Sequence, residues 1–180
     1  MSHFMTATHC ALLFIDWQER LFPAMTEKCR DRYLKNAENL HWLAKALDIP
    51  VLFSEQYPRG LGPTLSSLEA TNPIEKITFS AMQTPAFAAA VKQTNRQTIV
   101  LSGMETHICV AQTARDLVAA GYSVVVPADA VLSRRKLDWK MGLQRMVGDG
   151  CRLNTAEGIL FEWLEQAGTD LFKEVSKRIR

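Results

Sequence analysis

A short apolar run at residues 98–102 leads into a turn at residues 103–110, and apolar residues then recur at helical spacing up to Gly121. The run is β-branched and bounded by polar residues, which predicts a buried strand. The spacing after the turn, closed by a glycine, predicts a helix. The chain therefore contains a strand, a tight turn and a helix in direct succession.

Cys109 lies in this turn, where a chemical role competes with a structural one. Thr106 suits the helix N-cap, which places Cys109 in the first helical turn, where free N–H groups and the helix dipole favour an anion. A thiol in that position is biased toward the thiolate. Free cysteine is also among the most buried residue types, so a space-filling role stays open. His107 lies about 200° away around a helix, which argues against a Cys–His dyad within the turn.

Apolar strand runs and helical stripes alternate along the rest of the chain. The other predicted strands include residues 11–15, 51–54, 123–127 and a short edge strand at 151–153. The other predicted helices cover residues 33–47, a segment from near Pro85, residues 137–146 and a last helix capped by Thr155. This alternation predicts a three-layer α/β/α fold with a largely parallel, doubly wound sheet of about six strands. With 180 residues, 47% of them hydrophobic, we expect one domain over residues 1–180, in which residues 1–9 form a loose N-terminal extension.

Two further polar residues fall at the edge of the predicted sheet where Cys109 lies. Asp16 directly follows the run at residues 11–15, and Lys76 lies in a short segment of alternating apolar character. Ligands of parallel sheets bind outside the carboxyl ends of the strands, so these residues are candidates for a common site. Asp16 could instead cap a turn, and Lys76 could be a solvated residue paired with Glu75.

Residues 55–64 contain two prolines and two glycines, which excludes regular structure and predicts a shaped loop. The glycines match neither of the common phosphate-binding patterns. A loop that carries Tyr57 and Arg59 could form the wall of a pocket, dock a partner or be plain surface.

Charge and cysteine content argue against several classes of protein. The formal net charge of +2 gives no strong field for nucleic acid or a membrane surface, and the basic segment 173–180 fits a solvated helix end. The four cysteines have no C-x-x-C spacing, which argues against a zinc site and a disulfide framework and favours a reducing compartment. They are Cys10, Cys29, Cys109 and Cys151. No apolar run approaches the ~20 residues needed to span a bilayer, and with no export signal a cytoplasmic location is expected.

The ordered set of Asp16, Lys76 and Cys109 resembles that of the isochorismatase-like cysteine hydrolases. Residues 54–64 and 128–134 look most like one subgroup, the isochorismatase domain-containing proteins, and the resemblance covers nearly the whole chain. It implies Asp16 as general base, Lys76 as its cationic neighbour and Cys109 as nucleophile.

The resemblance also implies an oxyanion hole formed by the backbone N–H groups of Glu105 and Cys109, with a cis peptide bond between Met104 and Glu105. Gln18, Tyr57 and Met104 are the substrate-binding candidates. The Glu105 carboxylate would oppose thiolate formation unless it points away or pairs with a cation. A cationic or zwitterionic substrate is one explanation for its presence.

Two features separate the chain from other branches of this superfamily. Nicotinamidases carry an aspartate and histidines near the second strand as a metal site, whereas residues 54–58 contain no histidine. We therefore expect no catalytic metal and no cofactor. Isochorismatases proper act on a vinyl ether and lack the cysteine, so Cys109 argues against that reaction.

These observations predict a metal-independent cysteine hydrolase that cleaves a small amide or related C–N bond through a thioester on Cys109. The alternatives are a non-catalytic interaction protein, which would use residues 57–64 and the basic tail, and a redox-responsive thiol protein. The expected partner is a small-molecule substrate, with no nucleic acid and no membrane. A homo-oligomer is expected by analogy, with Trp42, Trp139 and Trp163 as interface or core residues.

Overall fold

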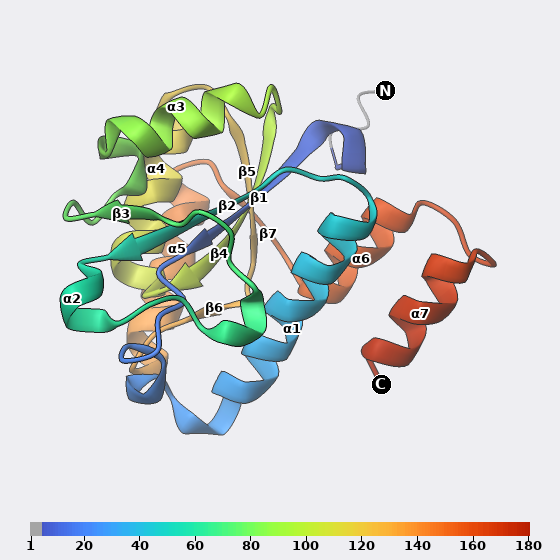
Figure 1. The fold of residues 1–180 in the computed structure, drawn as a ribbon, viewed down its shortest axis with the longest axis horizontal. Helices are drawn as coiled ribbons and strands as arrows, with labels where there is room; N and C mark the ends of the chain where they lie inside the picture. Colours follow the sequence, from blue (N-terminus) through green and yellow to red (C-terminus); the bar gives the residue numbers. More distant parts are fainter. Residues whose placement is uncertain (1–4) are drawn as a thin grey trace.

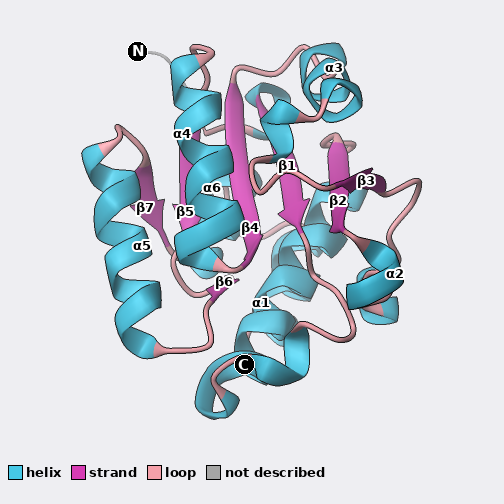
Figure 2. Ribbon diagram, turned by 90° about the vertical axis from the view of Figure 1, so that its left-hand side faces the viewer, coloured by secondary structure: helices cyan, strands magenta, loops and turns pink. Residues whose placement is uncertain are grey.

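The computed structural model describes residues 5–180 and shows a seven-stranded sheet between two layers of helices (Figure 1). The strands are β1 (Cys10–Ile15), β2 (Val51–Gln56), β3 (Ile74–Lys76), β4 (Thr98–Met104), β5 (Ser123–Pro127), β6 (Val131–Leu132) and β7 (Arg152–Asn154). Their order is β3-β2-β1-β4-β5-β7, with β6 paired to the end of β4, and these strands pair in parallel (Figure 2). The predicted fold class is confirmed. The sheet has one strand more than expected because β6 is too short to produce a sequence pattern.

The helices divide between the two faces of the sheet. Within residues 5–180 they are α1 (Glu27–Ala46), α2 (Pro58–Leu61), α3 (Pro85–Gln93), α4 (Ala111–Ala119), α5 (Lys136–Gly148), α6 (Ala156–Leu164) and α7 (Asp170–Arg178). α1 and α6 cover one face, α3, α4 and α5 cover the other, and α7 lies outside α1 and α6 (Figure 1). None of these helices is both long and apolar enough to cross a membrane.

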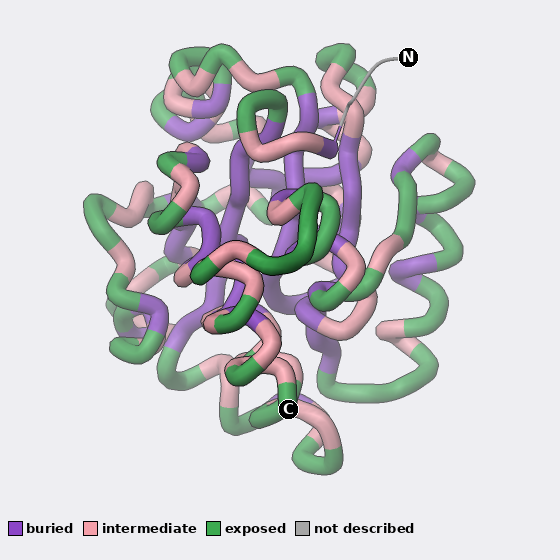
Figure 3. Tube along the Cα trace, turned by 90° about the vertical axis from the view of Figure 1, so that its right-hand side faces the viewer, coloured by how far each residue is buried: buried purple, intermediate pink, exposed green. Residues whose placement is uncertain are grey.

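β1 is a central strand, and all of its residues are buried. Leu12 and Phe14 pack in the cluster with α1 and α6, whereas Leu13 and Ile15 pack in the cluster under α3, α4 and α5. Burial of both faces explains why the run is continuously apolar instead of alternating. In Figure 3 the buried chain is concentrated in the strands and the exposed chain in the outer turns of the helices.

Three segments differ from the expectations drawn from the sequence. α1 begins at Glu27, well before the predicted start at residue 33, because its polar first turns carry no apolar stripe. The loop predicted to lack regular structure contains α2, and Pro58 fits its first turn because no N–H is needed there. α7 is separate from the last predicted helix, since the chain turns at Gly168, whose φ is +86°.

The expected N-terminal extension is partly packed against the domain. Residues 1–4 lie outside the described residues. Met5 is 5% exposed and packs in the cluster with α1 and α6, and Ala7–His9 forms a short 3-10 turn. The Arg96 guanidinium also donates a hydrogen bond to the Thr8 carbonyl.

Two glycines allow close packing at the edge of the sheet where β1 and β4 end. A Cβ added to Gly103 in β4 would lie 2.7 Å from the Ile15 Cβ. A Cβ added to Gly142 in α5 would lie 2.9 Å from the His107 Cα, in the turn after β4. Both separations are too short for real Cβ atoms, so any larger residue would displace this turn.

Candidate active site

The carboxyl ends of β1, β3 and β4 bring together the three residues predicted to form the site. Asp16 follows β1, Lys76 ends β3, and Cys109 lies in a single π-helical turn, Thr106–Val110, between β4 and α4. Lys76 Nζ lies 2.7 Å from Asp16 Oδ2, and both side chains are fully buried. Both of these charges act on the Cys109 thiol. The three side chains therefore form one cluster that is nearly closed to water.

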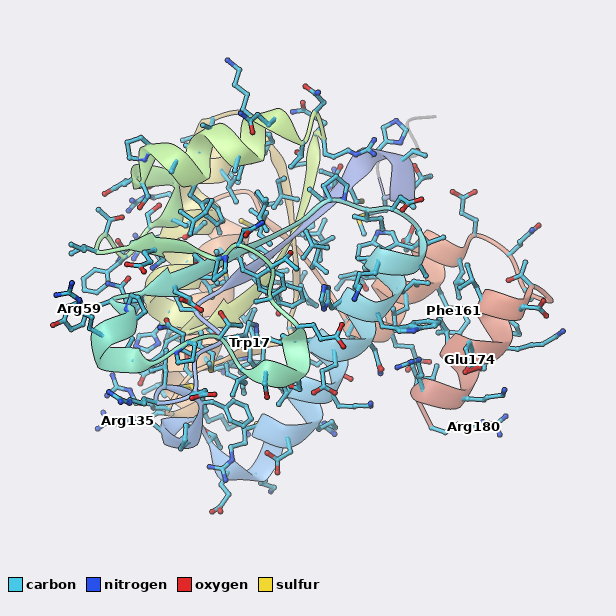
Figure 4. All side chains as sticks on the ribbon, in the orientation of Figure 1. Trp17, Arg59, Arg135, Phe161, Glu174 and Arg180 are labelled. Carbon is cyan, nitrogen blue, oxygen red and sulfur yellow. The ribbon has the colours of Figure 1, made fainter. Side chains whose placement is uncertain are left out.

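Neighbouring strands hold Asp16 in one orientation. Its backbone φ of +53° lies in the left-handed region, which few non-glycine residues adopt. Ser54 Oγ donates a hydrogen bond to Asp16 Oδ1 at 2.7 Å, and Lys76 contacts the other oxygen. The next residue, Trp17, lies inside the molecule (Figure 4), where its indole N–H donates to Ser102 Oγ at 3.1 Å. With Ser54 on one oxygen, Lys76 on the other and the neighbouring Trp17 side chain bonded to β4, the carboxylate has one defined position.

Lys76 is surrounded by oxygen atoms. Its ammonium donates to Gln56 Oε1 at 2.6 Å and to the carbonyls of Thr78 and Phe79 at 3.2 and 3.1 Å. A buried ammonium is tolerated when its protons are bonded and a counter-ion is in contact, and both conditions hold here. The arrangement fixes the positive charge beside Asp16 and Cys109.

The pKa values of the cluster favour a neutral thiol at rest. Burial raises the pKa of the Asp16 carboxyl, against the opposing effects of Lys76 and Ser54. Burial, reinforced by the negative charge of Asp16, raises the pKa of the Cys109 thiol to about 12. This direction is opposite to the bias toward a thiolate expected from the helix N-terminus, because desolvation and the nearby carboxylate outweigh Lys76. Cys109 can act as a nucleophile only if a base removes its proton during attack.

The turn that follows β4 has the geometry implied by the resemblance. The peptide bond between Met104 and Glu105 is cis, and Cys109 lies in the first helical turn. The N–H groups of Ile108 and Val110 donate to the Glu105 carbonyl at 3.0 and 3.2 Å. These bonds tie the turn back onto the residue whose N–H is a candidate oxyanion donor.

Thr106 does not cap this turn as expected. It is the first residue of the π-helical turn, and Glu105 occupies the N-cap position without a side-chain cap bond. The Thr106 hydroxyl is buried and has no hydrogen-bond partner among residues 5–180. The prediction fails because it assumed an α-helical start, whereas the chain forms a wider turn that begins one residue earlier.

Glu105 is paired with a cation and turned toward the loop after β6. Its Oε2 accepts from Arg134 Nε at 3.0 Å and from the Arg134 backbone N–H at 3.2 Å. One of the two conditions set for this carboxylate, pairing with a cation, is therefore met. Because the charge is already compensated, Glu105 gives no reason to expect a cationic substrate.

Two of the three substrate-binding candidates have no exposed surface. Met104 packs in the core, and the Gln18 amide is fully used, since it donates to the carbonyls of Gln56 and Gly62 and accepts from the Gln56 N–H. Gln18 therefore holds the loop after β2 and does not present its side chain to a substrate. Tyr57 is 56% exposed and borders an open depression of about 580 Å³ that Lys76 also lines.

Sequence reasoning missed two residues that complete the cluster, Ser54 and Gln56. Ser54 pairs in register with Ile15, next to Asp16, and Gln56 pairs in register with Lys76. Their position in the sequence could have indicated them. Both polar residues come at the end of an apolar run, in a strand that neighbours the strands next to Asp16 and Lys76. Their partners depend on strand register, which the sequence pattern did not give.

The stretch compared with the nicotinamidase metal site is used in a different way. Glu55 Oε1 accepts from the backbone N–H and the hydroxyl of Thr64, at 2.7 and 2.8 Å. No group of three or more histidine, cysteine, aspartate or glutamate side chains within residues 5–180 is arranged to hold a metal ion. Glu55 thus fastens the loop after β2 to the sheet.

Comparison with known proteins identifies similar chains. Residues 10–158 match the family model described as the isochorismatase domain. An isochorismatase domain-containing protein 2 from Danio rerio is 36% identical over 168 residues, covering 92% of this chain and 84% of that protein. An isochorismatase domain-containing protein 1 from Salmo salar is also 36% identical over 168 residues and 92% of this chain, but the match spans 59% of that protein.

Solved structures show the same fold. A structure described as MAR1 ribonuclease from Caenorhabditis elegans matches with a TM-score of 0.87 and 34% identity, covering 97% of this chain and 91% of that one. The YcaC gene product of Escherichia coli, described as an octameric hydrolase of unknown specificity, matches with a TM-score of 0.89 and 22% identity, covering 96% and 89%. At that identity the second likeness concerns the fold alone.

Proposed function

The chain belongs to the isochorismatase family, and on that premise we propose that it is a metal-independent cysteine hydrolase of small amides or related C–N bonds. The observation that carries the proposal is the buried cluster, in which Lys76 Nζ lies 2.7 Å from Asp16 and both charges act on the Cys109 thiol. A cysteine that only fills space needs no buried ion pair beside it. Shifted pKa values around a nucleophile at the carboxyl edge of a parallel sheet are typical of a catalytic site.

In the first step the Cys109 sulfur bonds to the substrate carbonyl carbon while its proton passes to the Asp16 carboxylate. The carbonyl electron pair moves to oxygen, where the N–H groups of Glu105 and Cys109 donate to the new charge. The C–N bond then breaks, and the leaving nitrogen takes the proton from Asp16. The products of this step are an amine or ammonia and a thioester on Cys109.

In the second step water attacks the thioester and gives a proton to Asp16. When the tetrahedral intermediate collapses, the C–S bond breaks and Asp16 returns the proton to the sulfur, which leaves a carboxylic acid. Lys76 holds Asp16 in place and keeps its pKa from rising further, so that the carboxylate can accept a proton. The raised pKa of Asp16 makes it a stronger base than an exposed aspartate.

The test is hydrolysis of a panel of small primary and secondary amides, with ammonia or amine release as the readout. Cys109→Ala is expected to lower turnover at least about a thousandfold, because no other group can form the thioester. Cys151→Ala is a matched control, since Cys151 is buried in the same apolar cluster and lies outside the site. Equal activity in wild type and Cys109→Ala would refute the proposal.

The name of the C. elegans structure raises RNA as a competing substrate, so a structured RNA belongs in the same panel. An amide hydrolase leaves the RNA intact. RNA cleavage that disappears in Cys109→Ala, with no amide turned over, would replace the amide proposal. No observation among the described residues favours that outcome.

We also propose assembly as a homo-oligomer through α5. Leu137 and Met141 lie one turn apart on this helix and are 66% and 44% exposed. The tryptophans considered for an interface are used internally: Trp163 is buried in the core, Trp42 stacks against Arg178, and Trp139 donates to a backbone carbonyl. Light scattering of wild type and Leu137→Glu tests this, and a wild-type monomer would refute it.

A further inference from the structure

A groove separate from the proposed catalytic cluster lies between the first half of α1 and the segment that joins β6 to α5. Its volume is about 440 Å³, within the range of small-molecule sites. None of Asp16, Lys76 and Cys109 lines it. The residues that matter for its chemistry are Lys28, Cys29, Arg32, Tyr33, Lys136 and Trp139.

Three of the lining side chains are cations, and the lining includes no carboxylate. Lys28, Arg32 and Lys136 form no ion pair within the described residues. The two nearest acidic residues along α1, Glu27 and Asp31, are both engaged by Arg30. A concave surface with several uncompensated positive charges attracts anions and raises their local concentration.

The walls between these cations are aromatic and apolar. Tyr33 and Trp139 face the groove together with Leu132. The Trp139 N–H donates to the Ala128 carbonyl at 3.1 Å, which fixes its ring, and the Arg32 guanidinium lies 5.6 Å from the centre of the Tyr33 ring. A ligand seated here would contact both flat apolar surface and the guanidinium and ammonium groups.

We infer that this groove binds a small organic anion, with a carboxylate, sulfonate or phosphate group carried on an aromatic or apolar body. An inorganic anion would satisfy the cations and leave the aromatic walls unused. A neutral aromatic would do the reverse. The combination selects a ligand that carries both features, and the inference does not depend on the proposed hydrolase activity.

The rate at which Cys29 is alkylated can report whether a ligand occupies the groove. It is half-buried and lines the groove, whereas the other three cysteines of the chain are buried elsewhere. A ligand in the groove should therefore slow alkylation of Cys29 by N-ethylmaleimide, with Cys10, Cys109 and Cys151 as internal references in the same mass spectrum. The probe is 2-naphthoate, and 2-acetylnaphthalene, a ketone with no C–N bond to cleave, is its neutral counterpart.

The expected result is that 2-naphthoate protects Cys29 in a saturable way and 2-acetylnaphthalene does not. Arg32→Ala and Lys136→Ala should each weaken that protection about tenfold, because each removes a charge-assisted contact. Lys35→Ala is the matched control, since Lys35 is another exposed lysine of α1 and lies outside the groove.

Three outcomes would overturn the inference. They are equal protection by 2-acetylnaphthalene and 2-naphthoate, protection by inorganic phosphate as strong as that by 2-naphthoate, and unchanged protection in the Arg32→Ala, Lys136→Ala double variant. Calorimetric titration of the Cys29→Ser variant with 2-naphthoate measures the affinity by a second method, which does not rely on alkylation of Cys29.

Discussion

Two ion pairs flank the turn that carries Cys109, and they differ in how far water reaches them. Asp16 and Lys76 meet at 2.7 Å with both side chains fully buried. Glu105 and Arg134 meet at 3.0 Å, but the Arg134 side chain is 57% exposed while that of Glu105 is 7% exposed. The charges of the first pair act on the thiol, and the second pair joins the turn to the loop after β6.

This difference in solvent access assigns the two pairs different roles. In a low-dielectric interior each charge depends on the other, so neither Asp16 nor Lys76 can be removed alone without leaving an unpaired buried charge. Arg134 can be replaced by water, which screens the Glu105 carboxylate at its open side. We call Asp16 and Lys76 the inner pair, and Glu105 and Arg134 the outer pair. We expect the inner pair to control proton transfer and stability, and the outer pair to adjust the position of the turn.

Lys76→Met breaks the inner pair and should have the largest effect. It leaves the Asp16 carboxyl buried without a counter-charge, and we expect a loss of about 3–5 kcal/mol in the free energy of unfolding. Urea denaturation at pH 7 measures this. Asp16→Asn combined with Lys76→Met should recover much of the loss, because no charge then remains buried. Lys92→Met, at an exposed lysine of α3, is the control. A loss in the free energy of unfolding no greater than that of Lys92→Met would contradict the stabilising role of this ion pair.

Ser54→Ala weakens the inner pair without removing a charge. The Ser54 hydroxyl donates to Asp16 Oδ1 at 2.7 Å in a buried setting, and loss of a hydrogen bond to a charged group costs about 1.5–3 kcal/mol. The same change should raise the pKa of Asp16, since that bond favours the carboxylate. Urea denaturation measures the first effect, with exposed Ser67→Ala as control. Identical stabilities of the two variants would mean that Asp16 Oδ1 does not need this donor.

Proton control by the inner pair can be tested through the reactivity of Cys109. Burial and Asp16 raise the thiol pKa to about 12, so alkylation by iodoacetamide should be slow at neutral pH and rise steeply above pH 9. Asp16→Asn removes a negative neighbour and should move the rise to lower pH, whereas Lys76→Met should move it to higher pH. Mass spectrometry distinguishes the alkylation of Cys109 from that of Cys29. Fast alkylation of wild-type Cys109 at pH 7 would show that a thiolate is already present.

The contrast between the pairs also shows what the sequence could predict. Asp16 and Cys109 could be predicted because each follows a recognisable strand, and parallel topology places strand ends at one edge. Lys76 lies only in a short segment of alternating apolar character, so its role rested mainly on the family resemblance. The contacts of Ser54 and Gln56 could not be predicted, because they depend on which residues of β1, β2 and β3 stand opposite one another. A register is set by packing of whole faces, which a single strand pattern does not encode.

The bias of Cys109 toward a thiolate is opposed in the folded structure for a related reason. Local sequence indicated a helix N-terminus, which favours a thiolate, but the degree of burial depends on residues distant in the chain. The pairing of Glu105 with Arg134 likewise joins two loops 29 residues apart. Helix and strand positions thus follow from local pattern, whereas charge states follow from the assembled environment.

Arg134→Ala breaks the outer pair and should have the smallest effect on stability. Because the Arg134 side chain is 57% exposed, the loss in the free energy of unfolding should stay below about 1 kcal/mol. The Arg134 backbone N–H, which donates to Glu105 Oε2 at 3.2 Å, remains and holds the carboxylate in part. If the Glu105 N–H stabilises an oxyanion, the small displacement of the turn should lower kcat severalfold and leave KM unchanged, and Arg134→Lys should restore most of kcat. Urea denaturation and steady-state kinetics on the amide found in the panel measure both quantities. A stability loss as large as that of Lys76→Met would show that solvent access does not distinguish the two pairs.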